Sequence, residues 1–117
     1  MAARGKEDFY RDFVLDQLRA LGGVTCRSMF GGYGLYLGKD FFGIIHKGRL
    51  YFKTDDTTRG KYKDSGSGPF APGKTQVLTS YYEVPAEIVE DDEQLTSWAG
   101  EAASRAGRGK ARGGKKR

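Results

Sequence analysis

Reactive side chains are scarce in this sequence, which contains one cysteine, Cys26, and one histidine, His46. A single cysteine excludes a disulfide within the chain and is typical of a reducing compartment. A zinc site needs about four Cys, His or carboxylate ligands, and the sequence has no such cluster. We therefore expect no metal and no cofactor, and the predicted location is cytoplasmic.

Long apolar runs are also missing. No stretch approaches the ~20 apolar residues of a membrane-spanning helix, and the charged start lacks the apolar segment of a signal peptide. The chain has 117 residues, of which 38% are hydrophobic and 13% aromatic. That is enough for one domain with a core of modest size. We expect no membrane partner.

Positive charge is concentrated at the end of the chain. No acidic residue follows residue 104, but seven basic ones do: Arg105, Arg108, Lys110, Arg112, Lys115, Lys116 and Arg117. Without them, 13 basic residues face 15 acidic ones, so the remainder is mildly acidic. Residues 107–117 contain only Gly, Ala, Lys and Arg, which bury too little apolar area to offset the entropy of ordering. The sequence predicts one domain over 1–106 and a disordered basic tail over 107–117.

Amphipathic helices are predicted near both ends of the domain. The first covers residues 7–21 and is stopped by Gly22 and Gly23. Its apolar positions are Phe9, Phe13, Val14, Leu18 and Leu21. The last helix is capped by Asp91 or Asp92 and ends at Gly107. Its apolar face holds Leu95, Trp98, Ala99, Ala102 and Ala106.

Short β-type runs separated by turn residues occupy most of the middle of the chain. The expected strands cover 24–30, 33–37, 41–46, 49–54 and 75–84. Their two- and three-residue connections leave no room for crossover helices, so the sheet is predicted to be antiparallel. A short helix is expected around 57–63, capped by Asp55 or Asp56. Phe70 is expected to pin the preceding glycine-rich loop to the core. The predicted fold class is α+β, with an antiparallel sheet of about five strands packed by the N- and C-terminal helices.

A catalytic role would have to rest on Cys26 and His46, which fall on different predicted strands. They can in principle form a thiolate–imidazole pair. A lone cysteine is more often a small buried hydrophobe, and His46 precedes a Lys-Gly turn, where we expect it to be exposed. The favoured interpretation is that the protein is not an enzyme.

Two other motifs have a ligand-binding and a structural interpretation. The acidic run 90–93 lacks the alternating ligands of a calcium loop, and its favoured role is to cap and charge the start of the last helix. The run 31–34 is rich in glycine, but a strand rather than a helix follows it. No helix N-terminus is therefore available for a phosphate, and a tight turn is favoured.

Tyrosines supply the candidate protein interface. Adjacent residues on a strand point to opposite faces of the sheet, so Tyr81 and Tyr82 cannot both be buried by a sheet that is covered on one side. One of them is expected to be exposed or covered by a partner. The candidate interface residues are Tyr33, Tyr36, Tyr81 and Tyr82.

Several separated motifs resemble the TfoX/Sxy N-terminal domain family. They are, in order, Arg27-Ser-Met-Phe-Gly-Gly-Tyr-Gly-Leu-Tyr36, Gly48-Arg-Leu-Tyr-Phe-Lys53, Gly68-Pro-Phe70, Tyr81-Tyr-Glu-Val-Pro85, Leu95 and Trp98-Ala99. The resemblance extends over about residues 9–106. It implies a two-layer fold with helices on an antiparallel sheet, similar to secretion-chaperone-like domains.

The resemblance also implies a function. The better-known members of this family are bacterial regulators of natural competence, the uptake of DNA, which act with a transcription activator and are not enzymes. They continue into a second, helical domain, whereas this sequence continues after Ala106 into the Gly/Lys/Arg segment. No site residue of the family is carried over to this chain.

Three functional hypotheses follow. The preferred one is a non-enzymatic regulatory or adaptor domain that binds another protein through the sheet or its tyrosine-bearing edge and acts in transcriptional regulation. The alternative is non-specific RNA or DNA binding through the basic tail, because Lys and Arg neutralise phosphates. An enzyme using Cys26 and His46 is the third. A monomer or a homodimer is expected.

Overall fold

The computed structural model describes residues 6–29, 31–71 and 77–114, with side chains described from residue 8 to residue 107 within these ranges. Its elements follow one another in the order α1 (Lys6–Gln17), a 3₁₀ turn (Arg19–Leu21), β1 (Val24–Met29), β2 (Gly32–Leu37), β3 (Asp40–His46), β4 (Arg49–Lys53), α2 (Arg59–Asp64), β5 (Pro69–Phe70), β6 (Leu78–Glu83), α3 (Ala86–Val89) and α4 (Asp92–Gly114).

The strands form one six-stranded sheet in the order β1-β2-β3-β4-β6-β5, and each neighbouring pair is antiparallel. Tight turns produce the meander from β1 to β4, while β6 is inserted between β4 and β5. Between β3 and β4, Lys47 and Gly48 have φ values of 52° and 73°, as a two-residue hairpin that matches the twist of the strands requires. The α+β class and the antiparallel sheet are confirmed. The sixth strand is β5, which lies in the segment predicted to be a loop.

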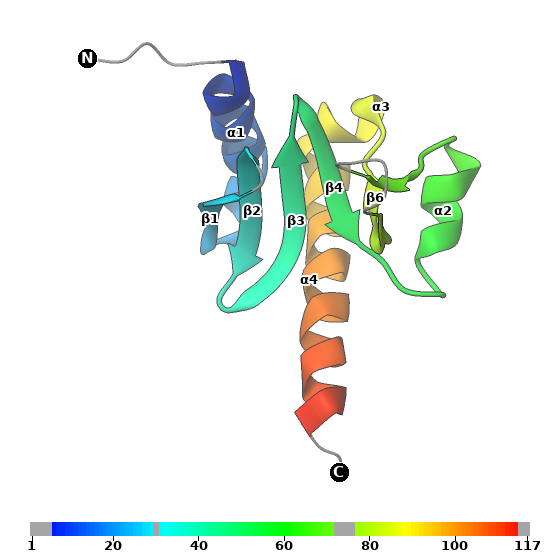
Figure 1. Cartoon of the computed structure of the whole chain (residues 1–117). Helices are drawn as coiled ribbons and strands as arrows, with labels where there is room; N and C mark the ends of the chain where they lie inside the picture. The colour runs from blue at the N-terminus through cyan, green and yellow to red at the C-terminus, as the bar shows by residue number, and fades with distance from the viewer. Residues whose placement is uncertain (1–5, 30, 72–76, 115–117) are drawn as a thin grey trace.

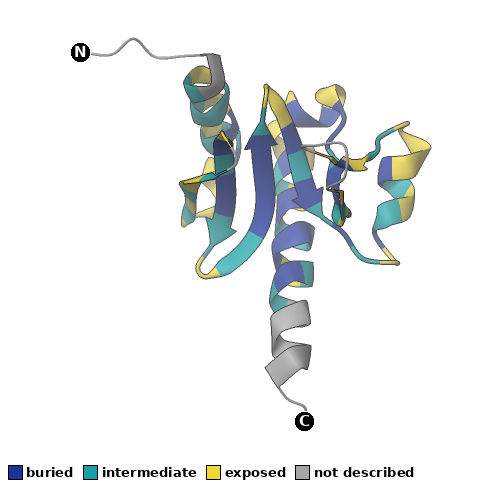
Figure 2. Ribbon diagram, viewed as in Figure 1, coloured by how far each residue is buried: buried dark blue, intermediate teal, exposed yellow. Residues whose placement is uncertain are grey.

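All the helices that pack on the sheet lie on one side of it. Figure 1 views the sheet from the other side, with α4 running behind β3 and β4. We call the helix-backed side the covered face. Its central side chains are almost fully buried: Leu35, Phe42, Ile45, Leu50 and Phe52 are at most 1% exposed. Figure 2 shows this burial running along the middle strands and continuing into α4. The core therefore lies between the sheet and α4.

Helix α4 approaches the sheet closely because its inner face is built from alanine. The side chains of Ala99, Ala102, Ala103 and Ala106 are buried there. At its start, the carboxylate of Asp91 accepts from the backbone N–H of Gln94 at 3.2 Å, which confirms the predicted cap.

The far end of α4 differs from the prediction. The helix was predicted to end at Gly107, and this is wrong, because α4 continues to Gly114. Helix α4 therefore extends through most of the segment that was predicted to be a disordered tail. The division into a domain over 1–106 and a separate basic tail stays a prediction.

The opposite side of the sheet, the open face, has its own smaller cluster. It centres on Ile44, Phe70 and Tyr81, with Phe41, Tyr51 and Leu78 packed against them. Phe70, from β5, is 1% exposed. The prediction that Phe70 pins its loop is confirmed, although the loop is held to this second cluster and not to the main core.

This second cluster overturns the expectation for the paired tyrosines. Tyr81 and Tyr82 are each 8% exposed, so neither is an exposed side chain. Tyr82 belongs to the main core, while Tyr81 belongs to the open-face cluster. The expectation was wrong because it assumed a sheet covered on one side only. Phe70 of β5 and Phe41 of β3 bury Tyr81 from the other side.

Candidate functional site

A row of aromatic rings crosses the open face. The rings of Tyr36 and Phe41 are stacked with centroids 5.2 Å apart, and those of Phe41 and Tyr81 are also 5.2 Å apart. The hydroxyl of Tyr81 donates to the carbonyl oxygen of Phe41 at 2.9 Å, which fixes the row across the sheet. Tyr36 and Phe41 are half-buried, so they keep exposed ring surface. Burial raises the pKa of Tyr81 and keeps its hydroxyl protonated.

A cation sits at each end of this row. The guanidinium of Arg27 lies over the ring of Tyr36, 5.2 Å from its centroid, and the ammonium of Lys53 lies over the ring of Tyr81 at 5.5 Å. These distances are within the range of cation–π attraction. The open face therefore combines exposed ring surface with two positive charges.

Acidic side chains lie mostly elsewhere. On the open face, Glu83 is bound by Arg49, at 3.0 Å and 3.2 Å to its two carboxylate oxygens. The carboxylate of Asp40, at the start of β3, lies against Gly107 of α4. The other acidic residues with described side chains are on the helices or in the segments directly beside them. The mild negative charge of the body is thus a property of its helical side, and the open face is positive.

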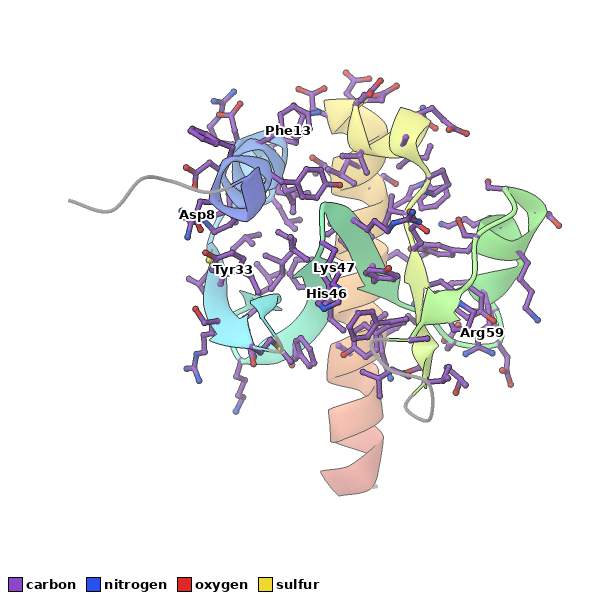
Figure 3. All side chains as sticks on the ribbon, turned by 45° about the horizontal axis from the view of Figure 1, so that its top comes forward. Asp8, Phe13, Tyr33, His46, Lys47 and Arg59 are labelled. Atoms are coloured by element: carbon purple, nitrogen blue, oxygen red, sulfur yellow. The ribbon has the colours of Figure 1, made fainter. Side chains whose placement is uncertain are left out.

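Tyr33 lies on the covered side of β2, where it contacts α1. Figure 3 shows Asp8 and Tyr33 near each other on these two elements, and the Tyr33 hydroxyl donates to the Asp8 carboxylate. This hydrogen bond is the main cause of a raised pKa of Tyr33. The Arg11 guanidinium lies 4.8 Å from the ring centroid. These contacts hold α1 to the edge of the sheet.

The four predicted interface tyrosines are therefore not brought together. Tyr36 and Tyr81 share the open face, while Tyr33 and Tyr82 pack on the covered side. Whether any of them contacts a partner stays a prediction.

The largest exposed apolar side chains of the described residues are Phe9, Phe13 and Val77, and two of them are on α1. Phe9 is 60% and Phe13 42% exposed. Phe13 also borders a pocket of about 260 Å³ between α1, the β3–β4 turn and α3, on the side of α1 away from Tyr33 (Figure 3). The other residues lining it are Tyr10, Gly48, Ala86, Val89 and Glu90.

A second pocket, of about 360 Å³, lies between the end of α1 and the start of α4. Its polar groups are engaged in holding the helices together. The Gln17 amide donates to the carbonyl oxygen of Val89 at 2.9 Å, and the Thr96 hydroxyl donates to that of Gln17 at 3.3 Å. Arg19 and Asp16 are ion-paired at 2.7 Å, and Asp92 and Glu93 line the pocket at the start of α4. This pocket is a helix junction.

Asp55 is the centre of a polar network that joins α2 to α4. Its carboxylate accepts from the hydroxyl and backbone N–H of Thr57 and from the backbone N–H of Thr58. Asp55 therefore closes the turn that leads into α2, while the N-cap position itself is Thr58, which makes no side-chain capping bond. The Thr57 hydroxyl, these N–H groups and the Arg105 charge lower the pKa of Asp55 to about 2.

Arg105 was predicted to contact nucleic acid as the first residue of the basic segment. In the structure its Nε lies 3.1 Å from the Asp55 carboxylate, and its side chain is 19% exposed. The contact is an ion pair without hydrogen-bond alignment. Arg105 is thus part of the folded body. The side chains of Arg108, Lys110, Arg112, Lys115, Lys116 and Arg117 lie outside the described residues, and their nucleic-acid role stays a prediction.

The two reactive residues do not meet. Cys26 packs against the main core on the covered side, whereas the ring of His46 lies against Phe70 on the open side, 5.3 Å between centroids. A Cys–His pair is therefore not formed. Between residues 8 and 107, where side chains are described, no group of three or more His, Cys, Asp or Glu side chains is placed to hold a metal ion. None of the described helices is both long and apolar enough to cross a membrane.

Sequence reasoning missed Phe9 and Phe13 as surface residues, although a signal was present. At about 100° per residue, they lie on a stripe of the helix roughly 140° from Val14 and Leu18. Two apolar stripes on one helix indicate two contacts, of which the sheet supplies one. The row formed by Arg27, Phe41 and Lys53 had no such signal, because strand pairing alone brings these residues together.

A helix-backed antiparallel sheet with these two surfaces defines a two-layer α+β domain. Residues 16–106 match the TfoX N-terminal domain, so the chain belongs to the TfoX N-terminal domain family. The resemblance seen in the sequence motifs is confirmed, and the domain is competence-regulator-like. Comparison with curated proteins finds no significant match.

Proposed function

We propose that this protein is a regulatory adaptor domain that acts in transcriptional regulation by binding another protein, as competence regulators do. The observation that carries the proposal is the exposed stripe of α1, formed by Phe9 and Phe13. Large apolar side chains that stay exposed next to a concave surface are typical of protein interaction sites.

The surroundings of the stripe define the partner chemistry. The pocket beside Phe13 is lined mainly by apolar and aromatic groups and has room for one large apolar side chain. Glu90 lines the same pocket and is exposed, so the pocket carries one carboxylate at its rim. The matching partner segment carries a leucine or an aromatic residue beside lysine or arginine, since such a segment fills the pocket and neutralises the Glu90 carboxylate.

Site-specific photo-crosslinking in the source cells tests the interface. A photoreactive phenylalanine analogue at position 13 of the full chain is expected to give one discrete adduct with a different protein. Position 77 is the matched control, because Val77 is 45% exposed and belongs to another part of the molecule. An adduct formed only with a second copy of this chain, or the same adduct from position 77, would contradict the proposal.

The regulatory part needs a separate readout. We expect deletion of the gene to change the transcript levels of a defined gene set, and the wild-type chain to restore them. Phe13→Glu places a charge in the apolar contact, where hot-spot side chains contribute about 2 kcal/mol or more. It is therefore expected to restore less than a tenth of the response. If Phe13→Glu restored the transcript levels fully, the α1 stripe would not be needed for regulation and the proposal would be wrong.

A further inference from the structure

We propose that the open face of the sheet is a binding site for single-stranded nucleic acid. This site is separate from the α1 stripe and from the basic C-terminal segment. It consists of the aromatic row Tyr36, Phe41 and Tyr81 with Arg27 and Lys53 at its ends.

The exposed ring surface is the first requirement. Single-stranded nucleic acids bind proteins by stacking bases on aromatic side chains that are displayed along a basic surface. Tyr36 and Phe41 are half-buried, and Tyr51 beside them is also half-buried. Phe70 and Ile44, each 1% exposed, form the floor that holds these rings in place. The rings are therefore held from below and stay partly exposed, with the Arg27 guanidinium placed over Tyr36.

The charges supply the second requirement. Arg27 and Lys53 flank the row, and the one acidic side chain described on this face, Glu83, is paired with Arg49. Cations at both ends of a stacking surface suit a ligand that alternates planar rings with phosphates. An apolar peptide would leave both charges without a counter-ion. The net negative charge of the body suggests that it repels phosphates. Because the acidic residues lie mainly on the helical side, a nucleic acid that approaches the open face does not meet them.

Duplex nucleic acid fits this face less well. Its bases are already stacked on one another, so it cannot use the ring surface. The proposal therefore predicts a preference for single strands, whereas binding to phosphates through the C-terminal lysines and arginines alone predicts none.

Fluorescence anisotropy with labelled oligonucleotides of about 12 residues tests the proposal, with poly-dT, poly-rU and a duplex of the same length as probes. The protein is the full chain with Arg108, Lys110, Arg112, Lys115, Lys116 and Arg117 replaced by glutamine. We expect this tail-neutral protein to bind the single strands and to bind the duplex at least tenfold more weakly. The two single strands separate a DNA ligand from an RNA ligand.

Variants of the open face then locate the site. Tyr36→Ala removes one stacking surface and is expected to weaken binding about tenfold. The double variant Arg27→Gln/Lys53→Gln is expected to lower the slope of log affinity against log salt by about 0.7 for each cation. Its matched control is Arg19→Gln/Lys63→Gln, which removes the same charge from exposed positions on helices and is expected to leave the slope unchanged.

Three outcomes would overturn the inference. They are loss of binding in the tail-neutral protein, equal affinity for the duplex, and an unchanged salt slope in Arg27→Gln/Lys53→Gln. The double variant changes exposed or half-exposed side chains and keeps the fold, so the result stands even if Tyr36→Ala unfolds. The α1 variant Phe13→Glu is expected to bind the oligonucleotides normally, so failure here and failure of the protein-binding proposal are distinguishable.

Discussion

The two faces of this sheet are made from the same strands, yet they differ in kind. On the covered face, Leu35 and Phe52 are fully buried beneath α4. On the open face, Tyr36 and Phe41 from neighbouring strands are only partly buried, and the Arg27 guanidinium lies over the Tyr36 ring at one end of the row. Strand alternation delivers every second residue to each face, so the helices decide what each face becomes.

The comparison shows how a mildly acidic protein can carry a positive surface. Composition adds all charges together, whereas folding sorts them. The carboxylates of α1 and of the segments around α3 and α4 lie on the helical side, and Arg27 and Lys53 lie on the other. The charge that a ligand meets depends on the face it approaches.

The largest expected effect separates the faces by stability. Phe52→Ala empties a site that is 0% exposed, and a Phe→Ala change in a core costs about 3–5 kcal/mol. Phe41→Ala, on the half-exposed row, is expected to cost less than half as much. Urea unfolding of the two variants measures the difference. Equal losses would show that the open face is a second core and not a surface.

Substitution of Gly32 and of Gly34 by alanine compares a glycine that faces backbone with one that faces side chains. A Cβ at Gly32 would lie 2.0 Å from the backbone oxygen of Ile45, while one at Gly34 would meet the Met29 sulfur at 2.5 Å and Phe41 Cε1 at 3.0 Å. Backbone in the middle of a sheet cannot move aside, but half-exposed side chains can. Gly32→Ala is expected to cost about 3 kcal/mol and Gly34→Ala about 1 kcal/mol. Thermal unfolding checks the order, and the reverse order would contradict the view that Met29 and Phe41 can adjust at Gly34 while the Ile45 backbone cannot at Gly32.

Acid titration tests the polar link between α2 and α4. The pKa of Asp55 is lowered to about 2 in the folded protein, so its stabilising contribution is fully present above the ordinary value of about 4. That contribution is lost as the pH falls from about 4 to about 2. Asp55→Asn keeps an oxygen that can accept from Thr57 and Thr58 but removes the charge, and its stability is expected to change less over this range.

The control for that titration is Asp55→Ala, which loses the side-chain hydrogen bonds as well and is expected to cost about 1 kcal/mol at neutral pH. Circular dichroism melts of the three proteins at several pH values make the comparison. If the stability of Asp55→Asn fell with acid as much as that of the wild type, groups other than Asp55 would be responsible for the loss.

The smallest effect comes from two buried tyrosine hydroxyls. The Tyr62 hydroxyl, beneath α4, finds no hydrogen-bond partner among the described residues, whereas that of Tyr81 donates to Phe41 at 2.9 Å. Tyr62→Phe is expected to leave stability unchanged or raise it by up to about 1 kcal/mol, and Tyr81→Phe to lower it by about 1 kcal/mol. Denaturant midpoints decide. A clear loss in Tyr62→Phe would mean that its hydroxyl is satisfied.

Local patterns were enough to predict most of the elements. Apolar spacing predicted a helix over 7–21, of which α1 ends at Gln17 and the last turn before Gly22 is a 3₁₀ turn. Short aromatic runs between Gly and Asp turns predicted the strands that became β1 to β4. The caps were predicted as Asp55 or Asp56 and as Asp91 or Asp92, because capping depends on a few consecutive residues, and Asp91 caps α4. The end of α4 was placed too early, since Gly107 weakens a helix without being able to end it alone.

Pairing between strands that are far apart in the sequence could not be predicted from local patterns. The two-residue strand β5 exists only because Pro69 and Phe70 pair with β6, and the burial of Tyr81 follows from that pairing. The positive open face depends on the same step, because Arg27, Phe41 and Lys53 come from different strands.

The sequence by itself determined the α+β class, the antiparallel meander from β1 to β4, the family and the separation of a basic end from an acidic body. These properties rest on periodicity, turn chemistry and composition, which act over a few residues or over the sum of all of them. Only the tertiary structure decided that Phe9 and Phe13 stay exposed, that Arg105 joins the folded body, and that one face of the sheet is positive and aromatic. The packing of α4 against one side of the sheet assigned each strand residue to a covered or an open face, and no local pattern contains that choice.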